Sequence, residues 1–179
     1  MNNIYNYILN LFFPKKCINC GRENSFLCDD CLSLIELNKI NYCACVKTPL
    51  KYKLKCNNCP PKICSVFTIF NEEQKLVQKL FLKSKSIPEL NIYFCYLIIT
   101  HLKNITNIVL DNTFAINYDN DEVKNIAQNL SKFIKIPINT KSKNILLITK
   151  KYPNEDIFKK IETLDVEKIY IISLFRQIF

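Results

Sequence analysis

Cysteine is the residue type whose spacing in this sequence predicts chemistry, and nine of the ten cysteines precede residue 65. Cys17 and Cys20 form one C-x2-C pair, and Cys28 and Cys31 form a second pair seven residues later. Each pair can fold as a tight knuckle that points both sulfurs at one ion, so two knuckles supply the four thiolates of a closed tetrahedral zinc site. Gly21 directly follows the first pair, where a knuckle often requires a positive φ.

A second group of cysteines is less regular. Cys43 and Cys45 form a C-x-C pair, Cys56 and Cys59 form a C-x2-C pair, and Cys64 follows. The C-x-C spacing makes a poorer knuckle than C-x2-C. We predict a second four-cysteine zinc site from Cys43, Cys45, Cys56 and Cys59. Two alternatives stay open: Cys64 replaces Cys45, or this half of the module has lost its metal.

A lysine-rich segment lies between the two pairs of this second group. In an extended chain Lys51, Lys53 and Lys55 share one face, and Tyr52 and Leu54 share the other. A basic ribbon that also bears an aromatic side chain can follow a nucleic-acid backbone. The segment therefore predicts a nucleic-acid-binding surface, with a solvated hairpin face as the alternative. In either case the metal would supply much of the folding energy of so small a module.

Composition limits the remaining function classes. The formal charge is +9, but the basic residues are mostly lysines, since Arg22 and Arg176 are the only arginines. Two four-cysteine zinc sites would lower the charge to about +5, which weakens the charge argument for nucleic acid. The sequence holds a single glycine, where average usage predicts about a dozen. A glycine-rich phosphate loop is therefore excluded.

The apolar stretches predict a cytoplasmic protein without an integral membrane segment. No run approaches the roughly 18 apolar residues of a membrane span. The segment from Ile4 to Phe13 lacks the basic flank and cleavage site of a signal peptide. Because nothing indicates secretion, we prefer zinc to disulfides or buried thiols for the first cysteine group.

Hydrophobic periodicity predicts an α/β protein, in which a small zinc-ribbon module precedes a reduced parallel sheet. We place the zinc ribbon and an N-terminal helix in residues 1–66 and the α/β domain in residues 67–179. The predicted helices are residues 1–13, 32–40, 72–83, 88–102, 121–133 and 157–164. The predicted strands are residues 66–70, 105–110, 134–138, 145–148 and 168–174.

Residues outside the cysteine module offer few further site candidates. Cys95 lies in an apolar helical pattern and is predicted to be part of the core. His101, the only histidine, is predicted to lie on the surface at a helix end. Asp119, Asp121 and Glu122 could bind a cation, but acids are also favoured at the start of a helix, which is the interpretation we prefer. No catalytic residues are predicted.

The segment from Asn144 to Asp156 has the order of a phosphate-binding strand, turn and helix. Its apolar run ends at Ile148, and Pro153 suits the first turn of a helix. Thr149, Lys150 and Lys151 stand in the predicted turn, which has no glycine and no acidic pair. We interpret them as a vestigial phosphate loop.

The order of these features resembles the ComF family, whose members carry zinc-ribbon fingers before a type I phosphoribosyltransferase domain. The resemblance is carried by the segment from Leu11 to Gly21, the second knuckle from Leu27 to Leu32, the strand Phe67–Phe70 with the helix that follows to Lys83, and the helix near residues 119–130. In that family two aspartates and a Thr-Thr-Gly loop bind phosphoribosyl pyrophosphate. Here Thr149 and Lys150 occupy the positions of the aspartates.

The resemblance implies a role in natural transformation, the uptake of DNA. We expect a protein that is not an enzyme and that binds single-stranded DNA or competence-machinery proteins through its zinc ribbons. A small-molecule substrate is not expected. The alternatives are a phosphoribosyltransferase that binds phosphoribosyl pyrophosphate, and a zinc-dependent scaffold that binds only protein.

Overall fold

Two compact units make up the chain. The computed structural model describes residues 14–39, 41–42, 49–50, 61–105, 113–138 and 141–176. Described residues up to Glu36 together with Gln74–Leu90 form the cysteine unit. The other described residues, within Leu37–Glu73 and Asn91–Phe179, form the sheet unit. The predicted domain boundary at residues 66 and 67 stays a prediction, because most of residues 43–60 lie outside the described part.

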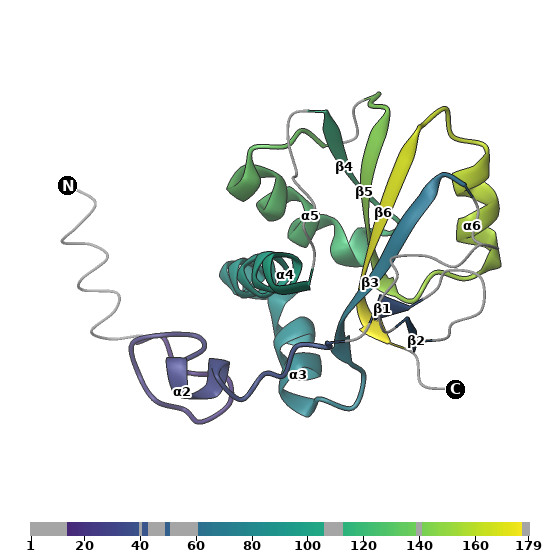
Figure 1. Ribbon diagram of the computed structural model, residues 1–179. Coiled ribbons are helices and arrows are strands. Elements are labelled where there is room, and N and C mark those ends of the chain that lie inside the picture. The colour runs from purple at the N-terminus through teal and green to yellow at the C-terminus, as the bar shows by residue number, and fades with distance from the viewer. Residues whose placement is uncertain are drawn as a thin grey trace, which may run out of the picture. The chain divides into compact units, whose positions relative to one another are not determined.

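The sheet unit is built on one mixed sheet in the order β2-β1-β3-β6-β5-β4 (Figure 1). β3, β6, β5 and β4 run parallel to one another, and β1 pairs antiparallel with both β2 and β3. This arrangement confirms the predicted α/β class with a four-stranded parallel sheet. The strands are β1 Asn41–Tyr42, β2 Pro49–Leu50, β3 Ile63–Asn71, β4 Phe114–Tyr118, β5 Asn144–Lys151 and β6 Lys168–Arg176.

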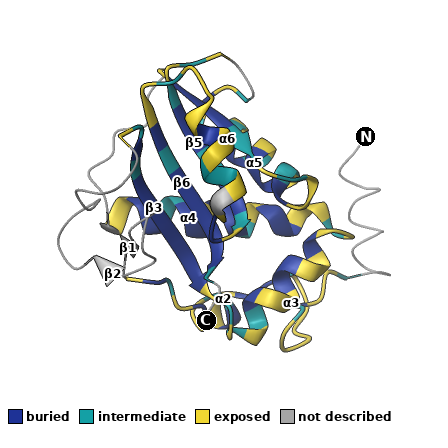
Figure 2. Cartoon of the chain, turned by 90° about the vertical axis from the view of Figure 1, so that its right-hand side faces the viewer, coloured by how far each residue is buried: buried dark blue, intermediate teal, exposed yellow. Residues whose placement is uncertain are grey.

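Helices cover both faces of the parallel sheet. Helices α4 (Asn91–Ile105) and α5 (Asp121–Ile134) pack together on one face, and α6 (Glu155–Glu162) covers the other (Figure 1). The inner strands are therefore buried on both sides, as Figure 2 shows for β3 and β6, and they consist mostly of apolar residues. The cluster on the α6 side comprises Ile63, Val66, Ile145, Tyr152, Ile161, Ile169 and Ile171.

Helix α5 follows directly from its sequence. Asn120 caps its start by accepting a hydrogen bond from the Glu122 backbone N–H, and Asp121 and Glu122 stand in the first turn, where the helix dipole favours acids. This confirms the helix-start interpretation of these acids. Lys135, at φ 58°, ends the helix in the left-handed conformation. The predicted inward positions are all buried: Val123, Ile126, Ala127 and Leu130.

The cysteine unit holds the short helix α2 (Asp29–Leu32), helix α3 (Lys75–Ser84) and the 3-10 turn η1 (Pro88–Leu90). One side chain joins the cysteine segment to α3. The Gln74 amide donates to the Glu36 carbonyl at 2.7 Å, and its oxygen accepts from the Glu36 N–H at 3.1 Å. We call this pair of bonds the Gln74 bracket. It ties two segments separated by 38 residues into one unit.

The structure corrects some of the predicted elements. β4 was not predicted. A strand was predicted at residues 105–110 instead, but Ile105 is the last residue of helix α4, and the rest of that range lies outside the described part. Ile138 makes a single bridge to Ile116 in place of the strand predicted at residues 134–138. The helix predicted at residues 32–40 is wrong: α2 ends at Leu32, because it is a single turn wrapped around the second cysteine pair. The helix predicted for residues 1–13 lies outside the described part.

His101 is buried, which corrects its predicted surface position. It is 1% exposed, and neither ring nitrogen has a hydrogen-bond partner among the described residues. Helix α4 packs against both α5 and β3, so even a polar position on it is enclosed. Burial lowers the pKa of His101 to about 4, from an ordinary 6.5.

Replacing His101 by leucine should remove a pH-dependent loss of stability. The native protein disfavours the charged imidazole and the unfolded chain does not, so the penalty is absent above pH 6.5 and grows as the pH falls toward 4. We expect wild type to lose on the order of 1.4 kcal/mol per pH unit in that window, relative to His101→Leu. Urea unfolding of both proteins from pH 7.5 to 4.5 measures this. If the difference in unfolding free energy between the two proteins stayed constant from pH 7.5 to 4.5, the buried imidazole would not be the cause of the loss.

Candidate metal centre

The first knuckle lies in a narrow loop closed by a backbone bridge between Lys16 and Glu23. The Cys17 N–H donates to the Arg22 carbonyl at 2.8 Å, and the Gly21 N–H donates back to the Cys17 carbonyl at 2.9 Å. The second bond turns the chain so sharply that Gly21 adopts φ +80°, as its place after the cysteine pair predicted. The loop thereby brings Cys17 and Cys20 to the same side.

The second knuckle coincides with helix α2. Cys28 is the residue that precedes the helix, and its carbonyl accepts from the Leu32 N–H at 2.8 Å. Cys31, on the helix itself, lies one turn further along. Three residues correspond to almost one helical turn, so the two sulfurs face the same direction.

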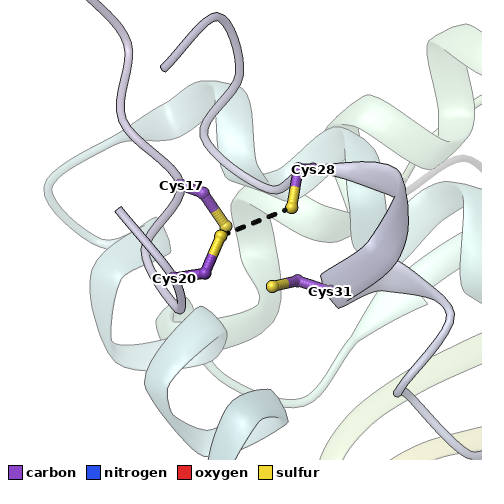
Figure 3. A group of neighbouring side chains, drawn as sticks. All are labelled: Cys17, Cys20, Cys28 and Cys31. Carbon is purple, nitrogen blue, oxygen red and sulfur yellow. Dashed lines mark hydrogen bonds between the residues drawn. The ribbon is translucent and has the colours of Figure 1, made fainter. Parts of the chain in front are cut away.

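The four sulfurs converge on one point, as Figure 3 shows. All four lie within 4.8 Å of one another, and the Cys20 and Cys28 sulfurs are 3.6 Å apart. A zinc–sulfur bond of about 2.3 Å in a tetrahedron requires sulfurs about 3.8 Å apart, so the spacing fits zinc. It does not fit a disulfide, whose sulfurs lie about 2.0 Å apart. All four cysteines are free thiols.

The surroundings of the sulfurs lower the pKa of one cysteine thiol and raise that of another. Burial acts to raise the pKa of Cys17, but N–H groups of Cys20, Cys28 and Asn19 outweigh it and lower that pKa to about 6. The Asn19 side chain donates to the Cys31 sulfur at 3.3 Å and favours its thiolate. Burial and the three neighbouring sulfurs outweigh this bond and raise the pKa of Cys31 to about 12. Four thiolates can therefore coexist here only around a cation that neutralises them.

An ion pair joins the two knuckles on the surface. The Arg22 guanidinium contacts the Asp30 carboxylate, and the pair connects the loop of the first knuckle to helix α2. Both side chains are exposed, so the pair contributes little stability by itself. Asn19 and Arg22 were not singled out from the sequence. Their position inside the first knuckle is the one signal that could have identified them.

The other predicted site residues divide into two groups. Those of the second zinc site, Cys43, Cys45, Cys56 and Cys59, and the lysines Lys51, Lys53 and Lys55 lie outside the described residues. Cys64 is half-buried on β3, and Cys95 is buried in the core as predicted. Within the described part of the chain, the only group of three or more cysteine, histidine or acidic side chains close enough to hold a metal is the four-cysteine centre.

Thr149, Lys150 and Lys151 do not form a turn, which corrects their predicted position. β5 continues through Lys151, and α6 begins only at Glu155, after the cap residue Asn154. Thr149 is fully buried, and its hydroxyl donates to the Lys151 carbonyl at 2.8 Å. Strand pairing with β6 persists to Lys151, because the alternating side chains still suit a sheet. The interpretation of these residues as a vestigial phosphate site stays a prediction.

Comparison with known proteins identifies the cysteine segment. Residues 8–60 match the family described as "Double zinc ribbon domain", and the four-cysteine centre lies inside this range. Neither the curated proteins nor the solved structures contain a match to this chain. The family match and the sulfur geometry agree: the centre is a zinc-ribbon site, formed by Cys17, Cys20, Cys28 and Cys31, and zinc is its cofactor. No helix in the described ranges combines the length and apolarity of a membrane span.

Substituting Gly21 by alanine should weaken zinc binding. A Cβ at this position would meet nothing within 4 Å, so the cost is that of the positive φ alone. A left-handed conformation costs a non-glycine residue about 1–2 kcal/mol, which corresponds to roughly five- to thirty-fold weaker zinc affinity. Competition with a chromophoric zinc chelator measures the affinity.

Asn24 offers the matched control, since it also has a positive φ, of 84°. Asn24→Gly should bind zinc at least as tightly as wild type, because glycine adopts this conformation without strain. Wild-type zinc affinity in Gly21→Ala would show that the first knuckle does not depend on the left-handed turn.

Proposed function

We propose that this protein is a non-catalytic relative of the ComF family that acts in natural transformation. It binds single-stranded DNA or competence-machinery proteins through its zinc-ribbon module. The observation that carries the proposal is the four-cysteine centre within a segment that matches double zinc ribbons. The closed set of four thiolates leaves no open coordination position, which fits a structural zinc that holds a binding surface in shape.

The junction between β5 and α6 supports a non-catalytic role. The Lys150 ammonium lies 2.7 Å from the Glu122 carboxylate, and the Lys151 ammonium lies 3.3 Å from the Glu72 carboxylate. Both cations are therefore neutralised by acids of the protein itself. A phosphoribosyltransferase site would need its positive groups free for a pyrophosphate, so the alternative of a phosphoribosyl pyrophosphate-binding enzyme has less support.

The start of α6 gives a second reason. The Asn154 side chain accepts from the Ile157 N–H at 3.1 Å and satisfies one of the donors that a phosphate would use. Asp156, in the first turn of the helix, adds negative charge at the same end. An anion would meet a capped and acidic helix start, so no small-molecule substrate is proposed.

Thiolate ligation of zinc fits a reducing compartment, so the proposal places the protein in the cytoplasm. Charge favours single-stranded DNA as the partner. Lysines and arginines exceed acids by nine in the whole sequence, and one zinc held by four thiolates lowers the net charge to about +7. The lysines Lys51, Lys53 and Lys55 fall inside the range that matches the double zinc ribbon. We propose them as part of the DNA-binding surface.

Zinc-loaded protein should bind a fluorescently labelled oligothymidine in an anisotropy titration, and removing zinc with a chelator should abolish binding. Replacing Lys51, Lys53 and Lys55 together by alanine should reduce the slope of log affinity against log salt by about 2, since each phosphate contact contributes about 0.7. A variant with the wild-type slope would exclude this surface. Wild type that fails to bind at 50 mM salt would exclude DNA and favour the scaffold that binds only protein.

A further inference from the structure

Helix α3 carries a row of lysines on its exposed side. Lys75, Lys79 and Lys83 are spaced four residues apart, so they lie along one side of the helix. The opposite side holds the buried residues Val77, Leu80, Phe81 and Ser84, and Figure 2 shows this division between exposed and buried positions. We call Lys75, Lys79 and Lys83 the lysine face.

The charges of the lysine face are not neutralised within the described part of the chain. None of the three lysines forms an ion pair with a described residue. Lys150 and Lys151 in the sheet unit, in contrast, each contact a carboxylate. The segment from Gln74 to Leu90 contains four lysines and a single acid, Glu89. The lysine face therefore presents a positive charge that is available to a partner.

The start of α3 is unusual for a helix that serves only stability. Its first turn contains no acid, and Lys75 occupies the position where the helix dipole disfavours a cation. Gln74 provides no side-chain cap, because its amide forms the Gln74 bracket with Glu36. A helix start that combines the positive end of the dipole with an added lysine is unfavourable alone and becomes favourable when an anion binds.

The spacing of the face matches a chain of phosphates. Residues four apart on a helix are separated by about 6 Å along the axis, and the whole face spans about 12 Å. Successive phosphates of an extended single strand have a similar separation, so three lysines can each contact one phosphate. Leu82 lies on the same exposed side and is 65% exposed, which offers an apolar surface to an unstacked base.

The lysine face belongs to the same compact unit as the zinc centre. The Gln74 bracket connects the residue before α3 to the end of the cysteine segment. Zinc binding, by folding that segment, would thereby also fix the start of α3. The face is outside the range that matches the double zinc ribbon, so the family description does not assign it.

We propose that the lysine face of α3 binds the phosphate backbone of single-stranded DNA and extends the zinc-ribbon surface. This inference rests on the proposed DNA-binding function and assigns that function a second set of contacts. The lysines act as separate point charges, so they hold phosphates without selecting bases. Binding through this face should therefore depend strongly on salt and weakly on sequence.

The test is an anisotropy titration of labelled oligothymidine, from 0.1 to 1 M salt, with the full zinc-loaded chain. Lys75, Lys79 and Lys83 are changed together to glutamine, which removes the charges and preserves helix propensity. Loss of three contacts should reduce the salt slope by about 2 and weaken binding about a hundred-fold at 0.1 M salt, with little difference near 1 M. The matched control changes the exposed Lys132, Lys159 and Lys160 of α5 and α6 to glutamine.

The outcomes separate this inference from the proposed function. If wild type binds DNA and the α3 variant has the same affinity and salt slope as the control variant, the lysine face does not bind DNA, and the proposed DNA-binding function stands. If wild type itself does not bind, the proposed function fails and the inference fails with it. Zinc content and circular dichroism report whether the triple variant folds. If the triple variant does not fold, the single variant Lys79→Gln takes its place. Its salt slope should fall by about 0.7, and an unchanged slope would rule out the lysine face.

Discussion

Four sulfur atoms held within 4.8 Å of one another are the constraint on which the cysteine unit depends. Residues 14–36 bury few side chains besides the cysteines, chiefly Leu27 and Ile35. So small an apolar core cannot offset the conformational entropy of ordering the segment. The gathered sulfurs would repel one another as thiolates without a cation. Zinc therefore supplies both the charge neutralisation and the folding free energy of this part of the chain.

The parallel sheet of the sheet unit is stabilised in a different way. Its parallel strands are covered by helices on both faces, and apolar burial provides the stability. Some polar groups at the ends of its strands and helices are satisfied internally. Lys62, for example, donates to the carbonyls of Glu162 and Leu164 at 3.1 and 2.6 Å, where α6 ends. The ion pairs of Lys150 and Lys151 follow the same principle. The sheet unit thus holds these charges in internal pairs, whereas Lys75, Lys79 and Lys83 of α3 form no ion pair with a described residue.

The sequence patterns predicted those features that are determined by residues close together in the chain. The C-x2-C spacing identified both knuckles, and apolar periodicity, with acids near the helix start, identified α5 and its four inward residues. β4 was missed because Phe114–Tyr118 is a short strand between polar segments, whereas the longer apolar run before it attracted the strand prediction. The extension of β5 from Thr149 to Lys151 was missed because the run of apolar residues ends at Ile148. Only pairing with β6 continues the strand beyond that point.

Long-range contacts left no signal in the sequence. The Gln74 bracket joins positions 38 residues apart, and nothing near Gln74 or Glu36 indicates the partner. His101 was predicted at the surface as a helix-end residue, but α4 continues to Ile105 and its packing encloses His101. Asn19 is an intermediate case. Its place within the first knuckle is visible in the sequence, but its bond to Cys31 depends on how the second knuckle folds against the first.

Metal analysis of the purified chain, compared with the double variant Cys28→Ser/Cys31→Ser, shows whether Cys17, Cys20, Cys28 and Cys31 hold a structural zinc. Wild type should contain one zinc per chain more than the variant. A wild-type value near two would support the second site at Cys43, Cys45, Cys56 and Cys59, and a value near one would exclude it. Equal zinc in both proteins, or none in wild type, would show that these four cysteines do not hold zinc.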